Sequence, residues 1–169
     1  TNTKKLIVAR VPVAGSEPAV HGDFELPGVA GTGARIALDF LEPGGAGTGR
    51  LLPTGKTREM VEGLEASLVD ASIPMVFVRA RDLGLTGTET PQTGDGDKAL
   101  CARLEKIRVA ASQLMGIPGS AATPKIAVVA APVEYTALDG TRVTRDAADV
   151  VGRAISMGNC HRAFPLTSS

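Results

Sequence analysis

The chain has 169 residues, and its 18 basic and 18 acidic side chains give a formal net charge of zero. A chain of this length buries roughly 70% of the surface that it exposes when unfolded, and one domain is the default expectation. Balanced charge without a block of like charges disfavours nucleic acid and anionic membranes as partners. No apolar run approaches the roughly 18 residues of a membrane span, and no secretory signal pattern is present. Composition therefore favours a cytoplasmic globular protein.

The two cysteines, Cys101 and Cys160, have no CxxC spacing. On their own they make neither a disulfide framework nor a structural zinc site, which suits a reducing compartment. We interpret each as a plain thiol, and we expect no metal.

In the first third of the chain, three segments alternate between apolar and polar residues. They are residues 6–13, 20–26 and 36–40. This period of two is typical of half-buried strands. In the second segment His21 falls on the polar face, which predicts a solvent-facing side chain.

The middle of the chain predicts two strands and one helix. Residues 64–70 and 75–79 are apolar runs around Pro74, which marks an edge, a bulge or a turn. Acidic residues at 95–97 cap a helix, whose apolar side chains recur at helical spacing until Gly116 and Pro118 end it.

The last third predicts further strands. Residues 125–133 form a near-continuous apolar run typical of a strand covered on both faces, and 138–141 form a hairpin turn. Residues 149–157 fit either a helix face or a strand, and we favour the strand. At least six strands and one substantial helix, without regular alternation, indicate the α+β class.

Three glycine-containing segments are candidate ligand loops. Residues 49–57 fail as a phosphate-binding loop because five residues, not four, separate the first Gly from the Gly-Lys pair. Thr54, Gly55 and Lys56 either hold a carboxylate or form an ordinary turn. Residues 31–34 and 44–49 lack the strand-to-helix context of a dinucleotide site and are interpreted as turns. No cofactor is implied.

The final segment, residues 156–169, gathers polar side chains in one loop. Neighbouring side chains diverge in an extended segment, so Cys160 and His161 do not form a nucleophile pair. His161 either contacts an anionic substrate or shuttles a proton, or it only makes a hydrogen bond. Thr167 and Ser168, with Ser169, are good N-cap residues of a helix that would offer its N–H groups to a carboxylate. Because the chain starts in a strand pattern and stops in this loop, we expect an interior piece of a longer protein.

Seven segments in this order resemble the PrpF family, the 2-methylaconitate isomerases and related 4-oxalomesaconate tautomerases. They are NTKKLIVARVPV, HGDFELPGVAGTGARIALDFLEP, LLPTGK, LVDASIPMVFVRARDLGLTGTE, LEKIRVAASQLMG, PKIAVVAAPVEY and SMGNCHRAFPLTSS. Together they cover essentially the whole chain, which is far more specific than any single motif.

The resemblance implies a fold similar to that of diaminopimelate epimerase. Such proteins have two related domains, each a mixed sheet or barrel wrapped around a central helix, with the active site in the cleft between them. Residues 1–18 would end the first domain and residues 19–169 would form most of the second, with the central helix missing from this chain. The family's catalytic lysine and cysteine would precede Thr1, so neither Lys56 nor Cys160 represents them. The family usually has Asn at the position of Lys56 and often Gly at the position of Ser72. These two differences leave the identity of the substrate undetermined.

The implied activity is cofactor-free isomerisation of an unsaturated di- or tricarboxylic acid of the methylaconitate, aconitate or oxalomesaconate type. The catalytic pair lies outside this segment, which would supply substrate-binding groups: Ser156, Gly158, His161, Thr167, Ser168, Thr54, Gly55 and Lys56. The partners are that acid and the missing domain and helix, and homo-oligomerisation is left open. The alternative is a non-catalytic carboxylate-binding or structural module, which an upstream lysine and Cys-Gly-Asn loop would argue against.

A missing central helix has a structural consequence. It would leave an apolar groove along Val128, Phe40 and Phe77, or a partner chain filling that groove. At about 25 cal/mol per Å2, a few hundred Å2 left uncovered costs several kcal/mol. We therefore expect the segment alone to be inactive and marginally stable.

Overall fold

A computed structural model describes residues 4–26, 29–117 and 119–168. It divides into two compact units, Thr1–Pro43 and Gly44–Ser169. The domain boundary expected at residue 18 concerns the whole protein and stays a prediction.

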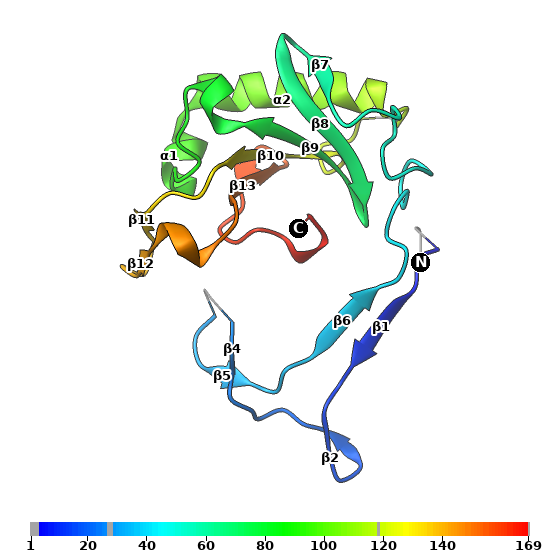
Figure 1. Cartoon of the computed structure of the whole chain (residues 1–169), viewed down its shortest axis with the longest axis vertical. Helices are drawn as coiled ribbons and strands as arrows, with labels where there is room; N and C mark the ends of the chain where they lie inside the picture. The colour runs from blue at the N-terminus through cyan, green and yellow to red at the C-terminus, as the bar shows by residue number, and fades with distance from the viewer. Residues whose placement is uncertain (1–3, 27–28, 118, 169) are drawn as a thin grey trace. The chain divides into compact units, whose positions relative to one another are not determined.

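The first unit consists of three short antiparallel strand pairs (Figure 1). They are β1 (Ile7–Arg10) with β6 (Ala37–Phe40), β2 (Val13–Ala14) with β3 (Glu17–Pro18), and β4 (Phe24–Glu25) with β5 (Thr32–Gly33). None of the described residues of this unit is buried.

Two strand predictions in this unit need correction. The strand expected over residues 20–26 is paired only at Phe24–Glu25, and its two faces are both exposed. The strand expected over residues 6–13 is interrupted after Arg10. Alternating apolar and polar residues provide one face of a strand that can be buried. No described layer of this unit covers that face, so burial does not stabilise longer strand pairs here.

The second unit is built on a six-stranded mixed sheet in the order β14-β13-β10-β9-β8-β7. Among the described strands only β9 and β10 pair in parallel, with Met75 opposite Lys125. The strands are β7 (Glu59–Val61), β8 (Leu64–Ala71), β9 (Ile73–Arg79), β10 (Lys125–Ala130), β13 (Val151–Ser156) and β14 (Asn159–Cys160). This sheet confirms the predicted α+β class, the core strand at β10 and the strand at β13.

Four short helices, one long helix and a small hairpin complete the second unit. The 3-10 helices are η1 (Ala80–Leu83), η2 (Arg145–Ala147) and η3 (Leu166–Ser168); the α-helices are α1 (Pro91–Gly96) and α2 (Lys98–Leu114); and the hairpin pairs β11 (Tyr135–Thr136) with β12 (Arg142–Val143). Its turn, closed by the Gly140 N–H on the Ala137 carbonyl at 3.0 Å, confirms the predicted hairpin.

Helix α2 connects β9 to β10 and covers one face of the sheet, while the C-terminal segment lies on the other side (Figure 1). The Asp97 carboxylate accepts from the Leu100 N–H at 2.9 Å and begins the helix, as its sequence predicts. Leu104, Ile107 and Ala111 lie on its buried side. They pack against core side chains of the sheet that include Val61, Ala66, Leu68, Val76, Val78, Ile126 and Val128.

The sequence predicts a break between two strands around Pro74, but strand β9 already includes Ile73 and Pro74. Pro74 is the second residue of β9, opposite Asp70, and the ladder to β10 begins one residue later at Met75. The N–H that proline lacks is therefore at a position of β9 that has no paired residue in β10. The reversal between β8 and β9 is made by Ser72, whose φ is 73°.

Beneath this reversal lies a fully buried carboxylate. The Asp70 Oδ2 accepts from the Gly47 N–H at 2.8 Å, the Thr48 N–H at 2.6 Å and the Thr48 hydroxyl at 2.8 Å. The chain reverses sharply at Gly45, where φ is 74° and an added Cβ would lie 2.5 Å from the Gly49 carbonyl carbon. Asp70 thus fixes residues 44–49 as the turn predicted from their glycines.

Candidate functional site

The turn between β13 and β14 presents two of the predicted site residues. Ser156 pairs with Asn159, and the two residues between them, Met157 and Gly158, both have positive φ, at 54° and 77°. Such a two-residue turn matches the twist of the strands that it joins. Ser156 and Gly158 line a cavity of about 260 Å3 on the α2 side of the sheet.

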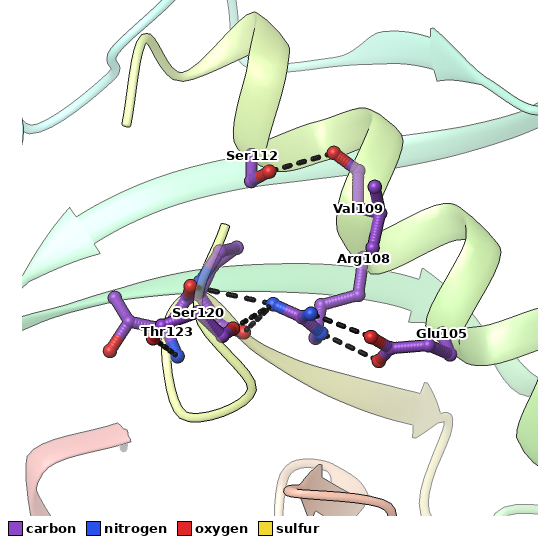
Figure 2. A network of polar contacts seen from close by, with 7 residues as sticks. Glu105, Arg108, Val109, Ser112, Ser120 and Thr123 are labelled. Carbon is purple, nitrogen blue, oxygen red and sulfur yellow. Dashed lines mark hydrogen bonds and ion pairs between the residues drawn. The ribbon is translucent and has the colours of Figure 1, made fainter. Parts of the chain in front are cut away.

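Arg108 lines this cavity and is only 3% exposed. Its guanidinium reaches from α2 toward the loop of Ser120 (Figure 2). Its Nε and Nη2 each donate to the Glu105 carboxylate at 2.7 Å, and its Nη1 donates to the Ser120 carbonyl at 2.7 Å. The Arg108 hydrogen bonds lower the pKa of Glu105. The next residue of that loop, Ala121, accepts from the Met157 N–H at 3.1 Å. Arg108 therefore ties α2 to the loop that supports the β13–β14 turn.

His161 directly follows β14. Its N–H donates to the Ala154 carbonyl at 2.8 Å, which extends the pairing with β13. Its Nε2 is buried and has no hydrogen-bond partner among the described residues. Burial, and secondarily Lys125, lowers the pKa of His161, so the imidazole is neutral at pH 7 and available as a donor or acceptor.

Ser168 ends the described C-terminal segment in η3. It is 4% exposed, and its Oγ has no hydrogen-bond partner within the part of the chain that the structure describes. It lines a larger cavity, of about 590 Å3, together with Phe77, Val129 and Phe164. Phe164 packs on Gly152, where an added Cβ would lie 3.0 Å from the ring.

The larger cavity combines apolar walls with positive charge. Arg145, Arg153 and Arg162 line it, and no carboxylate side chain is among its lining residues. The Arg153 Nε donates to the Glu89 carbonyl at 2.8 Å, and its guanidinium lies 5.7 Å from the Tyr135 ring centre. Such a lining favours an anion over a cation.

Of the residues predicted to line an apolar groove, Phe77 lines the larger cavity and Val128 does not. Val128 instead lies in the core between the sheet and α2. It sits one residue before Val129 on the strand, so its side chain points to the opposite face. Phe40 belongs to the first unit.

Comparison with known proteins gives a direct assignment. A family model described as PrpF protein matches residues 1–169. The chain belongs to the PrpF family.

Relatives of this PrpF chain are isomerases by name. The chain is 36% identical to a 3-methylitaconate isomerase of Eubacterium barkeri, over 100% of the chain and 48% of that protein. It is 34% identical to a 2-methyl-aconitate isomerase of Shewanella oneidensis, over 99% and 46%. It is 39% identical to a 4-oxalomesaconate tautomerase of Pseudomonas putida, over 78% and 37%. The chain thus spans about half the length of the first two relatives.

A solved structure shares the fold. The crystal structure titled methylitaconate-delta-isomerase matches with a TM-score of 0.88 and 35% identity, over 99% of this chain and 46% of that one. The mixed sheet with few helices is therefore that of a PrpF-type protein.

The structure brings some of the predicted PrpF site residues together and separates others. Ser156 and Gly158 share the smaller cavity, and Ser168 lines the larger one. Thr167 is exposed in η3. Ser169 lies outside the described residues, so the helix start expected at 167–169 is seen only as the 3-10 turn at Leu166–Ser168.

Thr54, Gly55 and Lys56 line neither cavity. They form a turn before β7, in which the Lys56 N–H donates to the Thr54 hydroxyl at 3.3 Å. The Lys56 ammonium lies 3.4 Å from the Glu59 carboxylate and is largely exposed. This arrangement is that of an ordinary turn, while its role in substrate binding remains a prediction.

Sequence reasoning did not single out Arg145, Arg153 and Arg162. Arg162 lies within the final loop, and its charge beside His161 was a signal that could have identified it. Arg153 falls in the middle of an apolar strand, where only the strand order shows what it faces. Among the described residues, no group of three or more His, Cys, Asp or Glu side chains could hold a metal ion. No described helix is long and apolar enough to cross a membrane.

Proposed function

We propose that the full-length protein is an isomerase that moves a proton and a double bond in an unsaturated di- or tricarboxylic acid, without a cofactor. The observation that carries this proposal is the match of the whole chain to proteins named methylitaconate, methylaconitate and oxalomesaconate isomerases. The acids in those names share a carbon–carbon double bond next to carboxylate groups.

Such a reaction needs three kinds of group. A base removes a proton from an allylic carbon, an acid returns one at the other end of the double bond, and cations or N–H groups stabilise the enolate-like state between them. In our proposal the acid and the base, a lysine and a cysteine, lie outside these 169 residues. This chain supplies groups that hold carboxylates.

The polar groups of the C-terminal segment suit that role. His161 presents a buried, neutral imidazole nitrogen without a partner, and Ser168 presents a buried hydroxyl without a partner. Buried polar groups are rarely left unpaired, so an unpartnered pair in one short segment favours a ligand or a further protein segment as their partner. Arg162 lies between them in sequence and adds positive charge.

The proposal includes the finer fold. We propose a diaminopimelate epimerase-like protein in which residues 1–18 complete one domain and residues 19–169 form most of another. In this arrangement a helix outside the described residues covers Phe77, Val129 and Phe164. The apolar lining of the larger cavity supports this arrangement.

The direct test uses the full-length protein in deuterated water, with methylitaconate, methylaconitate, aconitate and oxalomesaconate followed by NMR. We expect one of these acids to isomerise with incorporation of solvent deuterium at the allylic carbon. If no acid isomerises or exchanges, the proposal is wrong, and saturable binding without turnover would favour the non-catalytic carboxylate-binding module.

A variant tests the role of the C-terminal segment. We expect Ser168→Ala to raise KM by about fivefold to thirtyfold with little change in kcat, because a hydrogen bond to a carboxylate is worth about 1 to 2 kcal/mol. Thr136→Ala, which removes an exposed hydroxyl on β11, is the matched control. An unchanged KM for Ser168→Ala would remove Ser168 from the binding site.

A further inference from the structure

Two cysteines that are far apart in the sequence lie at one place in the fold. Cys101 stands in the first turn of α2, and Cys160 is the last residue of β14. Both are partly buried and line the same small cavity, of about 30 Å3, with Leu100 and Leu104 among its apolar walls.

Gly94 of α1 contacts both thiols. The Cys101 thiol donates to the Gly94 carbonyl, with a distance of 3.3 Å between sulfur and oxygen. A Cβ added to Gly94 would lie 3.7 Å from the Cys160 Cβ and 4.0 Å from its Sγ. Because glycine has no side chain, only the Gly94 backbone lies next to the two cysteines.

The backbone around Cys160 is held in place on the same side. Its N–H donates to the Asp95 Oδ1 at 2.7 Å, which ties β14 to the end of α1. Cys101 lies four residues after Asp97, whose carboxylate caps α2. Both cysteines therefore extend from hydrogen-bonded backbone rather than from free loops.

We propose that Cys101 and Cys160 form a reversible disulfide when the protein meets a low-molecular-weight disulfide such as glutathione disulfide. The disulfide would link the start of α2 to β14. The sequence, in contrast, predicts two independent thiols. The bond requires Cα atoms about 4.4 to 6.8 Å apart, so the proposal implies that the two cysteines approach to this separation across the small cavity that both of them line.

The exchange proceeds in two balanced steps. The Cys101 thiolate attacks one sulfur of glutathione disulfide, which forms a mixed disulfide and releases one glutathione thiolate. The Cys160 thiolate then attacks the Cys101 sulfur and releases the second glutathione. The two protein thiols lose two protons and two electrons in total, and glutathione disulfide is reduced to two glutathione thiols.

The surroundings of Cys160 favour this order. Burial, and secondarily the nearby Asp95 carboxylate, raises the pKa of the Cys160 thiol, and Arg153 opposes this effect. A thiol that keeps its proton is a poor first nucleophile. We therefore place Cys160 second, where its attack occurs within one molecule and a small fraction of thiolate is enough.

The test uses the full-length protein in glutathione buffers of increasing oxidised fraction, followed by intact mass measurement and peptide mapping. We expect the native protein to lose two hydrogen atoms, to yield a crosslinked peptide of Cys101 and Cys160, and to recover its mass with dithiothreitol. The crosslink should also raise Tm, because it constrains the unfolded chain.

Two variants serve as matched controls. Cys101→Ser and Cys160→Ser should each lack the crosslink and the rise in Tm. The proposal is overturned if the native wild-type protein carries only glutathione adducts, stays unmodified, or forms the crosslink only after denaturation. Since none of these measurements uses turnover, a failure here is separate from a failure of the proposed isomerase activity.

Discussion

The units before and after residue 43 both contain strands with alternating apolar residues, but only the second unit buries these side chains. In the first unit, Ile7, Val8 and Leu38 are 54%, 43% and 43% exposed. In the second unit, Leu68 and Val76 are 1% and 0% exposed. The second unit has α2 to cover its sheet, whereas the first has paired strands without a described covering layer. An alternating pattern of apolar residues therefore predicts which face of a strand can be buried. Whether that face is buried depends on a second layer of structure that packs against it.

The largest expected difference between the two units is in the cost of losing an apolar side chain. Leu68→Ala should lower the free energy of unfolding by about 2 to 5 kcal/mol, because it opens a cavity in the core beneath α2. Leu38→Ala should change it by about 0.5 kcal/mol or less, as for other surface positions. Urea denaturation of both variants measures the difference. An equal loss for Leu38→Ala would show that another part of the protein covers the first unit.

A smaller difference is expected for two aspartates. Asp70→Ala removes a fully buried carboxylate and leaves Gly47 and Thr48 without their acceptor, which should cost about 2 to 3 kcal/mol. Asp39→Ala removes an exposed ion pair with Arg10 and should cost less than about 1 kcal/mol. Thermal or urea unfolding of the two variants provides the comparison. Similar losses would mean that Asp70 does not hold the 44–49 turn.

The smallest expected effect is a pH dependence specific to the second unit. The hydrogen bond from Arg108 lowers the folded-state pKa of Glu105 below its usual value of 4.5. The stability that this pair contributes is therefore fully present above pH 4.5 and is lost as the pH falls through the folded-state pKa. Since Glu105 is about half exposed, the contribution should not exceed about 1 kcal/mol.

Unfolding measured between about pH 6 and about pH 3 tests this expectation. The wild-type protein should lose more stability on acidification than Arg108→Met, in which Glu105 has lost its partner. Glu25→Gln, on the exposed strand β4, should follow the wild-type curve. Parallel curves for the wild-type protein and Arg108→Met would exclude a role of this pair in the acid response.

Much of the second unit was predictable from local patterns. The cap at Asp97, the helix that follows it, the apolar run of β10 and the turn at residues 138–141 are signals carried by neighbouring residues. Helix α1 was missed because its sequence, PQTGDG, has two glycines and little apolar content. The reversal at Ser72 was missed because a positive φ at a non-glycine residue has no clear sequence signal.

The candidate site was less predictable, because its geometry depends on strand order. Ser156 and Ser168 are both polar residues of the final segment, yet they line different cavities on the two sides of one sheet. The proximity of Cys101 to Cys160 likewise follows from the packing of α1 against both α2 and β14. No spacing rule along the chain encodes such contacts between distant segments.

The single parallel pairing in the sheet also bears on how the chain reaches this structure. β7, β8 and β9 are joined by tight turns, so their ladders close over short distances along the chain. β10 pairs with β9 only after residues 80–124, with η1, α1 and α2, have been placed between them. Closing so long a segment carries a loop entropy cost before any pairing compensates it. We expect the hairpins to form early and the docking of β10, with the β13 and β14 strands beyond it, to set the folding rate of this unit.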